Sequence, residues 1–215
     1  MKTFGPHFKH VILAAVLLAC PFVSQVKAVL LSPGGVLAAT YEPDPSGGTA
    51  LDTMSVPFSS GVLQGTLISS VIAGDANNPF GGLTFTYQIV ISSLSTDSAS
   101  QISVSSYASF LTDTSYNNTG TYAGTDVPDY MSRSSGVGDV VRFTFLFNTI
   151  GAGSSSALLV IQSSAQNWNF TTAGVTDGQT VNVNSLAPST VPEPASCALI
   201  LVGLGLAGFR LRRSK

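Results

Sequence analysis

The central part of this sequence contains neither cysteine nor histidine. Cys20 and Cys197 lie near the two ends of the chain, and His7 and His10 both precede residue 11. Residues 29–190 therefore offer no structural disulfide and no Cys/His zinc site. They also lack a cysteine nucleophile and a Ser-His-Asp triad, because each of these needs one of the two missing residue types.

Positive charge is nearly as scarce. Only 9% of the chain is charged, and Arg133 and Arg142 are the only basic residues between positions 28 and 209. Ten Asp and Glu residues share residues 29–190 with them, so this segment carries a net charge of about −8. A surface of that sign repels a phosphate backbone, so nucleic acid is excluded as a partner.

Carboxylates are the remaining catalytic candidates. Glycoside hydrolases use two acidic side chains on either side of the scissile bond. Asp126 and Asp129 lie in a loop-like stretch, and Asp139 follows a glycine-rich turn. Their spacing matches no particular mechanism and is typical of aspartates that form turns. A carboxylate-based hydrolase is therefore the weakest of the three functional hypotheses considered below.

Calcium is the metal that oxygen ligands alone could hold. Asp75, Asn77 and Asn78 lie close together but do not form a complete calcium loop, and an Asx-rich turn explains them better. The sequence thus predicts no catalytic residue, no cofactor-binding residue and no metal-binding residue, and the protein is expected not to be an enzyme.

Aromatic residues support a second hypothesis, a carbohydrate-binding module. Their flat faces stack on sugar rings when they are exposed, whereas packing in a core is their default role. The candidates are Tyr107, Tyr116, Tyr122, Tyr130 and Trp168.

The middle of the chain has the alternation of apolar and polar residues that is typical of strands. Residues 83–91 and 141–147 show it most clearly, and Val141, Phe143, Phe145 and Phe147 share one face. Weaker candidates are residues 65–73, 102–111, 157–163, 168–172 and 180–186. Frequent Gly/Asn/Asp turns and the lack of an amphipathic helix predict an all-β, jelly-roll-like β-sandwich over residues 29–186.

The N-terminus is typical of a secretory signal peptide over residues 1–28. Lys2 and Lys9 form a basic region before an apolar run, and cleavage is expected between Ala28 and Val29. A permanent helical anchor is disfavoured because Pro21 interrupts the run. Lipidation at Cys20 is disfavoured because Leu18 is atypical two residues before a lipoprotein cysteine.

The C-terminus is apolar over residues 195–209 and basic over residues 210–215, where Arg210, Arg212 and Arg213 lie. A helix of 15 residues extends about 22 Å and falls short of the ~30 Å hydrocarbon core. Local thinning of the bilayer and snorkelling arginines can close part of that gap. We therefore expect a transmembrane helix with a cytoplasmic basic tail, joined to the domain by a linker over residues 187–194.

Val191, Pro192, Glu193 and Pro194 stand directly before this apolar segment. The order of a Pro-Glu-Pro motif, a short glycine-rich helix and an arginine cluster resembles the PEP-CTERM sorting signal of Gram-negative bacteria. The same tail also resembles the segment called an ice-binding protein C-terminal domain, a name that implies nothing about the preceding domain. The resemblance covers about 25 residues, and it implies processing near the motif by exosortase, a membrane transpeptidase, in bacteria that build an exopolysaccharide and biofilm matrix.

Together these features predict an exported, non-catalytic component of the cell surface or extracellular matrix. The membrane would hold its precursor through the C-terminal helix, exosortase would be its processing partner, and exopolysaccharide is a further candidate partner. The carbohydrate-binding module and the carboxylate-based hydrolase remain the alternatives.

Overall fold

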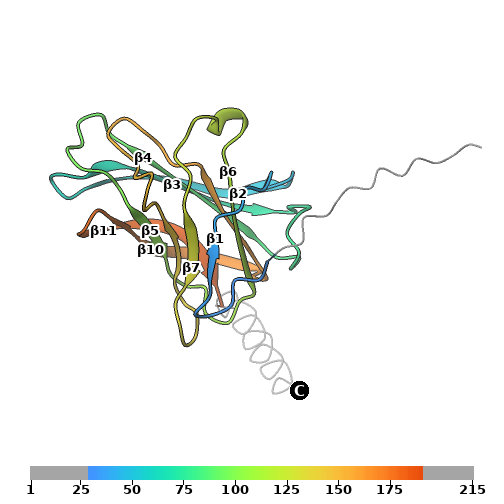
Figure 1. The fold of residues 1–215 in the computed structure, drawn as a ribbon. Helices are drawn as coiled ribbons and strands as arrows, with labels where there is room; N and C mark the ends of the chain where they lie inside the picture. The colour runs from blue at the N-terminus through green and yellow to red at the C-terminus, as the bar shows by residue number, and fades with distance from the viewer. Residues whose placement is uncertain (1–28, 191–215) are drawn as a thin grey trace, which may run out of the picture.

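The computed structural model describes residues 29–190, and within them two β-sheets pack face to face (Figure 1). The six-stranded sheet has the order β1-β7-β8-β5-β10-β11, and the five-stranded sheet has the order β2-β3-β4-β9-β6. Every neighbouring pair of strands is antiparallel. The predicted all-β sandwich is confirmed.

The strands are short to medium in length, as the turn density predicts. The first sheet contains β1 (Val36–Ala38), β7 (Tyr130–Arg133), β8 (Val141–Thr144), β5 (Gln101–Val104), β10 (Asn167–Thr176) and β11 (Thr180–Ser189). The second contains β2 (Thr49–Ser59), β3 (Gln64–Ala73), β4 (Thr84–Ile91), β9 (Leu158–Ser163) and β6 (Thr112–Asn117). A single 3-10 turn, Gly120–Tyr122, is the helical element of the described chain.

The core lies between the two sheets, where alternate residues of each strand point inward. Phe85 and Ile161 from the five-stranded sheet and Ile102 and Phe143 from the other are completely buried. Tyr87 crosses the same layer, and its hydroxyl group bonds to the Tyr107 hydroxyl (2.8 Å) and to the Leu186 carbonyl (2.7 Å). The phenol oxygens at the centre of the core therefore have the partners that burial requires.

Several predicted strands correspond closely to observed ones. The segments 65–73, 83–91 and 157–163 match β3, β4 and β9 to within one residue at each end. The segments 168–172 and 180–186 are the N-terminal parts of longer strands, β10 and β11.

Two predicted strands are too long. The segment 102–111 is a strand only to Val104, because Ser106 and Ser109 adopt positive φ angles of 79° and 69° and turn the chain away. The segment 141–147 is a strand only to Thr144. Phe147, expected on the buried face, is 81% exposed because the chain has left the sheet before it.

The predicted boundary between domain and linker also needs correction. β11 continues to Ser189, so residues 187–189 pair with β10 rather than forming the first part of the linker. Ala187 is completely buried, which the sequence does not indicate because alanine suits a linker and a core equally.

Four strands were missed. β2 contains Pro57, which disfavours a strand assignment, but β2 is an edge strand where the missing amide breaks no ladder. β6 consists of Thr-Asp-Thr-Ser-Tyr-Asn and lacks an apolar signal, although its first four residues are buried. β1 and β7 are only three and four residues long.

The two predicted sorting segments lie outside the described residues. This holds for the signal peptide at residues 1–28 and for the motif, helix and basic tail from residue 191 onward. Within residues 29–190, no helix has the length and apolar character needed to cross a membrane.

One buried cation binds four carbonyl groups from three segments of the sandwich. Arg133, at the end of β7, is only 5% exposed. Its guanidinium group donates to the carbonyl groups of Gly138 (2.7 Å), Leu31 (3.1 Å), Tyr107 (2.6 Å) and Phe110 (2.9 Å). A planar group with several fixed donors is the side chain that can satisfy so many acceptors at once.

Replacing this group by a flexible ammonium group tests its importance. Arg133→Lys removes the planar fork and leaves buried carbonyl groups unpaired, each at a cost of about 1–3 kcal/mol. We expect the free energy of unfolding in urea to fall by about 3 kcal/mol or more. Arg142→Lys, at a half-buried position of β8, makes the same chemical change and should cost less than about 0.5 kcal/mol. Equal losses in the two variants would contradict the role of Arg133.

Candidate functional site

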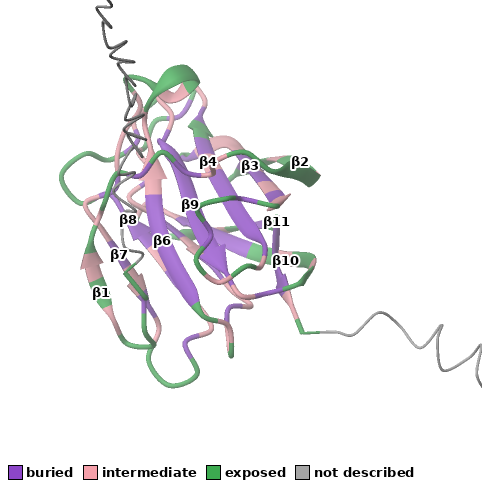
Figure 2. Cartoon of the chain, turned by 90° about the vertical axis from the view of Figure 1, so that its right-hand side faces the viewer, coloured by how far each residue is buried: buried purple, intermediate pink, exposed green. Residues whose placement is uncertain are grey.

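The five-stranded sheet is buried on both of its faces at the end formed by β9 and the edge strand β6. β6 and β9 are buried along most of their length (Figure 2). The strand register places Asp113 of β6, Gln162 of β9 and Thr84 of β4 side by side. Their chain neighbours Ile161 and Phe85 point into the core, so this polar row faces away from the core. All three side chains are nevertheless buried, at 3%, 2% and 0% exposure.

The loop between β3 and β4 covers one end of this polar row. The Asp75 carboxylate accepts hydrogen bonds from the Thr84 hydroxyl (2.7 Å) and from the Gln162 amide (3.2 Å). Its other oxygen accepts from the backbone N–H groups of Ser46 (2.9 Å) and Asn77 (3.0 Å). Four donors fill the accepting capacity of this carboxylate, so Asp75 has a structural role in the described chain.

The Asn78 side chain also has a structural role, because its polar atoms bond to neighbouring groups of the fold. Its side-chain nitrogen donates to the Thr84 hydroxyl (3.2 Å) and to the carbonyls of Leu83 (3.2 Å) and Ser163 (3.2 Å), and its oxygen accepts from the Phe80 N–H (2.9 Å). Asp75, Asn77 and Asn78, the sequence candidates for calcium, thus form the Asx-rich turn that was their alternative interpretation.

The other end of the polar row is acidic. Residues 40–42 run along the free edge of β6, where the Glu42 N–H donates to the Tyr116 carbonyl (3.0 Å). This pairing brings Glu42 and Asp44 over the outer face of β6, close to Asp113. We call Glu42, Asp44 and Asp113 the acidic cluster. Their exposed fractions are 8%, 1% and 3%.

Burial makes it costly to ionise the carboxyl groups of the acidic cluster. Burial, together with the hydrogen bond to Asp44 and the nearby carboxylates of Asp113 and Asp44, raises the pKa of Glu42 to about 8. Burial also raises the pKa of Asp113 to about 6, although the Thr114 N–H (2.8 Å) partly stabilises its charge. At neutral pH, Glu42 therefore keeps its proton.

Two polar contacts hold Asp44 in place. The Asn77 side-chain amide donates to the Asp44 carboxylate at 2.7 Å, and the Asn117 amide donates to the Asp44 carbonyl at 3.3 Å. Asp113 is less well satisfied. Its Oδ2 atom is buried and has no hydrogen-bond partner among the described residues. Such an atom is uncommon in a native fold and requires an explanation.

The three aspartates that the hydrolase hypothesis uses are not gathered in this cluster. Asp129 accepts hydrogen bonds from the backbone N–H groups of Leu146 and Phe147. Asp139 accepts from the N–H groups of Ser106 (3.1 Å) and Ala108 (3.4 Å). Both carboxylates hold loop segments that are distant from them in the sequence. The backbone of Asp126 forms an isolated β-bridge with Ser156, and burial raises the pKa of the Asp126 carboxyl group.

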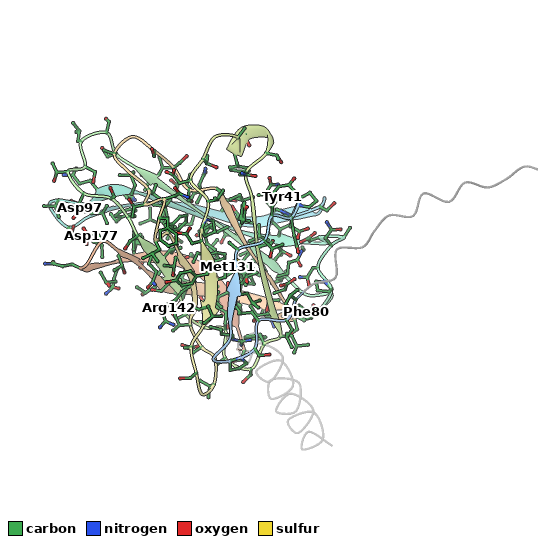
Figure 3. The ribbon with its side chains drawn as sticks, viewed as in Figure 1. Tyr41, Phe80, Asp97, Met131, Arg142 and Asp177 are labelled. Atoms are coloured by element: carbon green, nitrogen blue, oxygen red, sulfur yellow. The ribbon has the colours of Figure 1, made fainter. Side chains whose placement is uncertain are left out.

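The aromatic candidates do not form an exposed row. Tyr107 is completely buried in the core, and Tyr116 and Trp168 pack against the core. Tyr41, which Figure 3 labels above the edge of the sandwich, meets Tyr116 edge to face with ring centroids 6.2 Å apart. Packing explains these rings better than sugar stacking.

A shallow groove lies elsewhere, along β2, β3 and β4. Pro57, Phe58, Gln64, Thr66 and Val90 contribute to its lining, which contains no titratable side chain. Within residues 29–190, no group of three metal-ligating side chains has the arrangement of a metal site.

Sequence reasoning missed the acidic cluster. Glu42 and Asp44 directly precede Pro43 and Pro45 in a stretch that looks like a loop, and Asp113 lies in a strand without aliphatic residues. The only sequence signal for a buried Asp113 is its position among threonine and serine residues. This pattern is equally typical of an exposed strand.

The acidic cluster predicts a dependence of stability on pH. Because the folded pKa of Glu42 is raised from 4.5 to about 8, the folded state binds an extra proton between those values. The free energy of unfolding should therefore fall as pH rises from about 5 to 8, and the melting temperature should drop by several degrees. Glu42→Gln, which stays neutral, should flatten this slope. Asp97→Asn, at an exposed carboxylate, should leave it unchanged, and an unchanged slope in Glu42→Gln would refute the assignment.

Comparison with known proteins identifies the end of the chain rather than the sandwich. No curated protein and no solved structure matches the chain. Residues 190–214 match the family described as the PEP-CTERM protein-sorting motif. This confirms the resemblance found in the Pro-Glu-Pro motif, the apolar segment and the arginine cluster. The chain is therefore an exported protein with a PEP-CTERM tail, which anchors its precursor in the membrane and directs its sorting by exosortase.

Proposed function

We propose that this protein is a non-catalytic component of the cell surface or of the extracellular biofilm matrix, where exopolysaccharide is its surrounding partner. The PEP-CTERM motif carries the proposal. The matched segment begins at residue 190, directly after β11 ends at Ser189, so sorting would act on a chain whose last strand is already part of the sandwich.

The arrangement of the carboxylates supports a non-catalytic role. Hydrolysis of a glycosidic bond needs two acids that face a substrate. In the described domain, Asp75, Asp129 and Asp139 accept hydrogen bonds that hold loops, and the acidic cluster is almost completely buried. The groove along β2, β3 and β4 has no acid in its lining.

The surface chemistry suits a hydrated polysaccharide matrix. Residues 29–190 carry few charges, with an excess of acidic ones, and the chain contains many serine and threonine residues whose hydroxyl groups can hydrogen-bond to sugars. Phe147 and Phe170 are 81% and 65% exposed, but they lie after β8 and on β10 and do not form a stacking platform. The proposal therefore places the protein in the matrix without assigning it a defined sugar site.

A test for catalysis uses the exopolysaccharide of the producing bacterium. We expect no release of reducing ends when the exported protein is incubated with this polymer, and the protein should co-fractionate with the matrix in intact biofilms. Release of sugar that is lost in the Asp126→Asn or Asp129→Asn variant would overturn the non-catalytic assignment.

The sorting step is tested by replacing Pro192, Glu193 and Pro194 with three alanines. The prolines disfavour a helix, so the replacement removes the recognition element and favours extension of the following helix. We expect unprocessed precursor to accumulate in the inner membrane, while the sandwich still folds. Immunoblots of membrane, periplasmic and matrix fractions measure the outcome.

Pro57→Ala is the matched control for that experiment. It removes an exposed proline from edge strand β2 and leaves the tail intact, so its sorting should be like that of the wild type. If the triple-alanine variant lost its tail and reached the matrix as fast as the control, the role of the motif would be disproved.

A further inference from the structure

The N-terminal segment of the described domain is held in a fixed position beside the acidic cluster. Leu31 is completely buried. Its N–H donates to the Thr112 carbonyl at 2.8 Å, and its own carbonyl accepts from the Arg133 guanidinium at 3.1 Å. Two residues span at most about 7 Å of chain, so these contacts restrict where Val29 can lie.

Val29 lies against Asp113. Its backbone N–H donates a hydrogen bond to the Asp113 carboxyl group. The Asp113 Oδ2 atom is nevertheless buried without a hydrogen-bond partner in the described chain. The groups that face this carboxylate are the Glu42 and Asp44 carboxyls and the Thr114 N–H, so it has acidic neighbours and a single neutral donor besides Val29.

The basic side chains of residues 29–190 do not supply the missing positive charge. Arg133 directs its guanidinium group to four backbone carbonyls, and Arg142 belongs to β8 in the opposite sheet. A buried aspartate with a charged partner is stable, whereas one with only acidic neighbours destabilises the fold at neutral pH.

We infer that cleavage of the signal peptide between Ala28 and Val29 supplies this charge, and that the new α-ammonium group of Val29 forms an ion pair with Asp113. The inference rests on the export of the protein and on the predicted cleavage site. In the cleavage, water adds across the Ala28–Val29 peptide bond. The hydroxyl group goes to the Ala28 carbonyl carbon, and the Val29 nitrogen takes up the protons that make it an ammonium group.

The product has the donors that the cluster needs. The single N–H that contacts Asp113 in the uncleaved chain becomes a group with three N–H donors at the same position. One donor can keep the present contact while another reaches Oδ2. Export processing would thus complete the fold, and the mature domain would be more stable than the same domain with a blocked N-terminus.

The composition of the chain makes this inference unusually easy to test. Residues 28–214 contain no lysine, so the Val29 α-amine is the only primary amine of the mature domain. Reagents that acetylate amines therefore report on this one group once the tail with Lys215 is removed, and peptide mapping separates the two amines where the tail is retained.

The experiment measures the pKa of that amine in the exported protein. Mass spectrometry first establishes that the chain begins at Val29. Competitive acetylation between pH 6 and 10, against a Val-Leu dipeptide as reference, then gives the pKa. An ordinary α-amine titrates at about 7.7–8.0. We expect a value at least about one unit higher, and acetylation at pH 7 about tenfold slower than that of the dipeptide.

Two variants separate the ion pair from a general effect of folding. Asp113→Asn should return the pKa of the amine to its ordinary range. Insertion of Ser-Gly between Ala28 and Val29 leaves Asp113 intact but moves the ammonium group by up to about 7 Å. This insertion should also restore the ordinary pKa and lower the melting temperature by several degrees. Asp97→Asn is the matched control, because Asp97 (labelled in Figure 3) also accepts from the next N–H (2.8 Å) but is exposed and lies in the loop between β4 and β5.

Each outcome decides the inference. An ordinary pKa in the wild type, or a raised pKa that persists in the insertion variant, would overturn it. A chain that begins at Met1 or at a lipidated Cys20 would overturn it as well, and mass spectrometry distinguishes that result from an absent ion pair. None of these results affects the sorting proposal, which the Pro-Glu-Pro variant tests independently.

Discussion

The guanidinium group of Arg133 is the contact on which much of the sandwich depends. It binds the carbonyls of Leu31, Tyr107, Phe110 and Gly138, which belong to the N-terminal segment, the loop after β5 and the β7–β8 turn. Burying a charge is costly unless every donor finds a partner, so the four acceptors and the cation have to be assembled together. The packing of the N-terminal segment against β6 follows from this constraint.

The cost of burying charge also shapes the outer face of the five-stranded sheet. The β3–β4 loop and the segment that holds Glu42 and Asp44 cover the row formed by Asp113, Gln162 and Thr84. Asp75 is satisfied by four donors, whereas the acidic cluster is crowded and is left with an unpartnered oxygen. Loop packing explains why Asp75 has four donors. The position of Val29 beside Asp113 accounts for the unpartnered oxygen of the acidic cluster.

These features fit the non-catalytic role that we propose, in which the protein acts through its location outside the cell. The sandwich ends at Ser189 and the sorting motif is matched from residue 190, so folding and sorting occupy adjacent and separate parts of the chain. Both ends of the domain are sites of processing: the tail by exosortase, and the N-terminus by the cleavage that we infer. A sandwich held by internal hydrogen bonds suits the matrix location that we propose.

The sequence by itself determined the features that depend on local pattern or on composition. Alternation revealed β3, β4 and β9, the lack of Cys and His excluded whole classes of chemistry, and the order of three elements identified the tail. Only the tertiary structure decided which polar residues are buried. β6 lacks a local signal because loops distant in sequence supply its environment, whereas β2 alternates but is interrupted by Pro57. For the same reason no pattern could show that Glu42, Asp44 and Asp113 meet, or that Arg133 is a core residue: burial of a charge depends on partners that only the folded chain brings together.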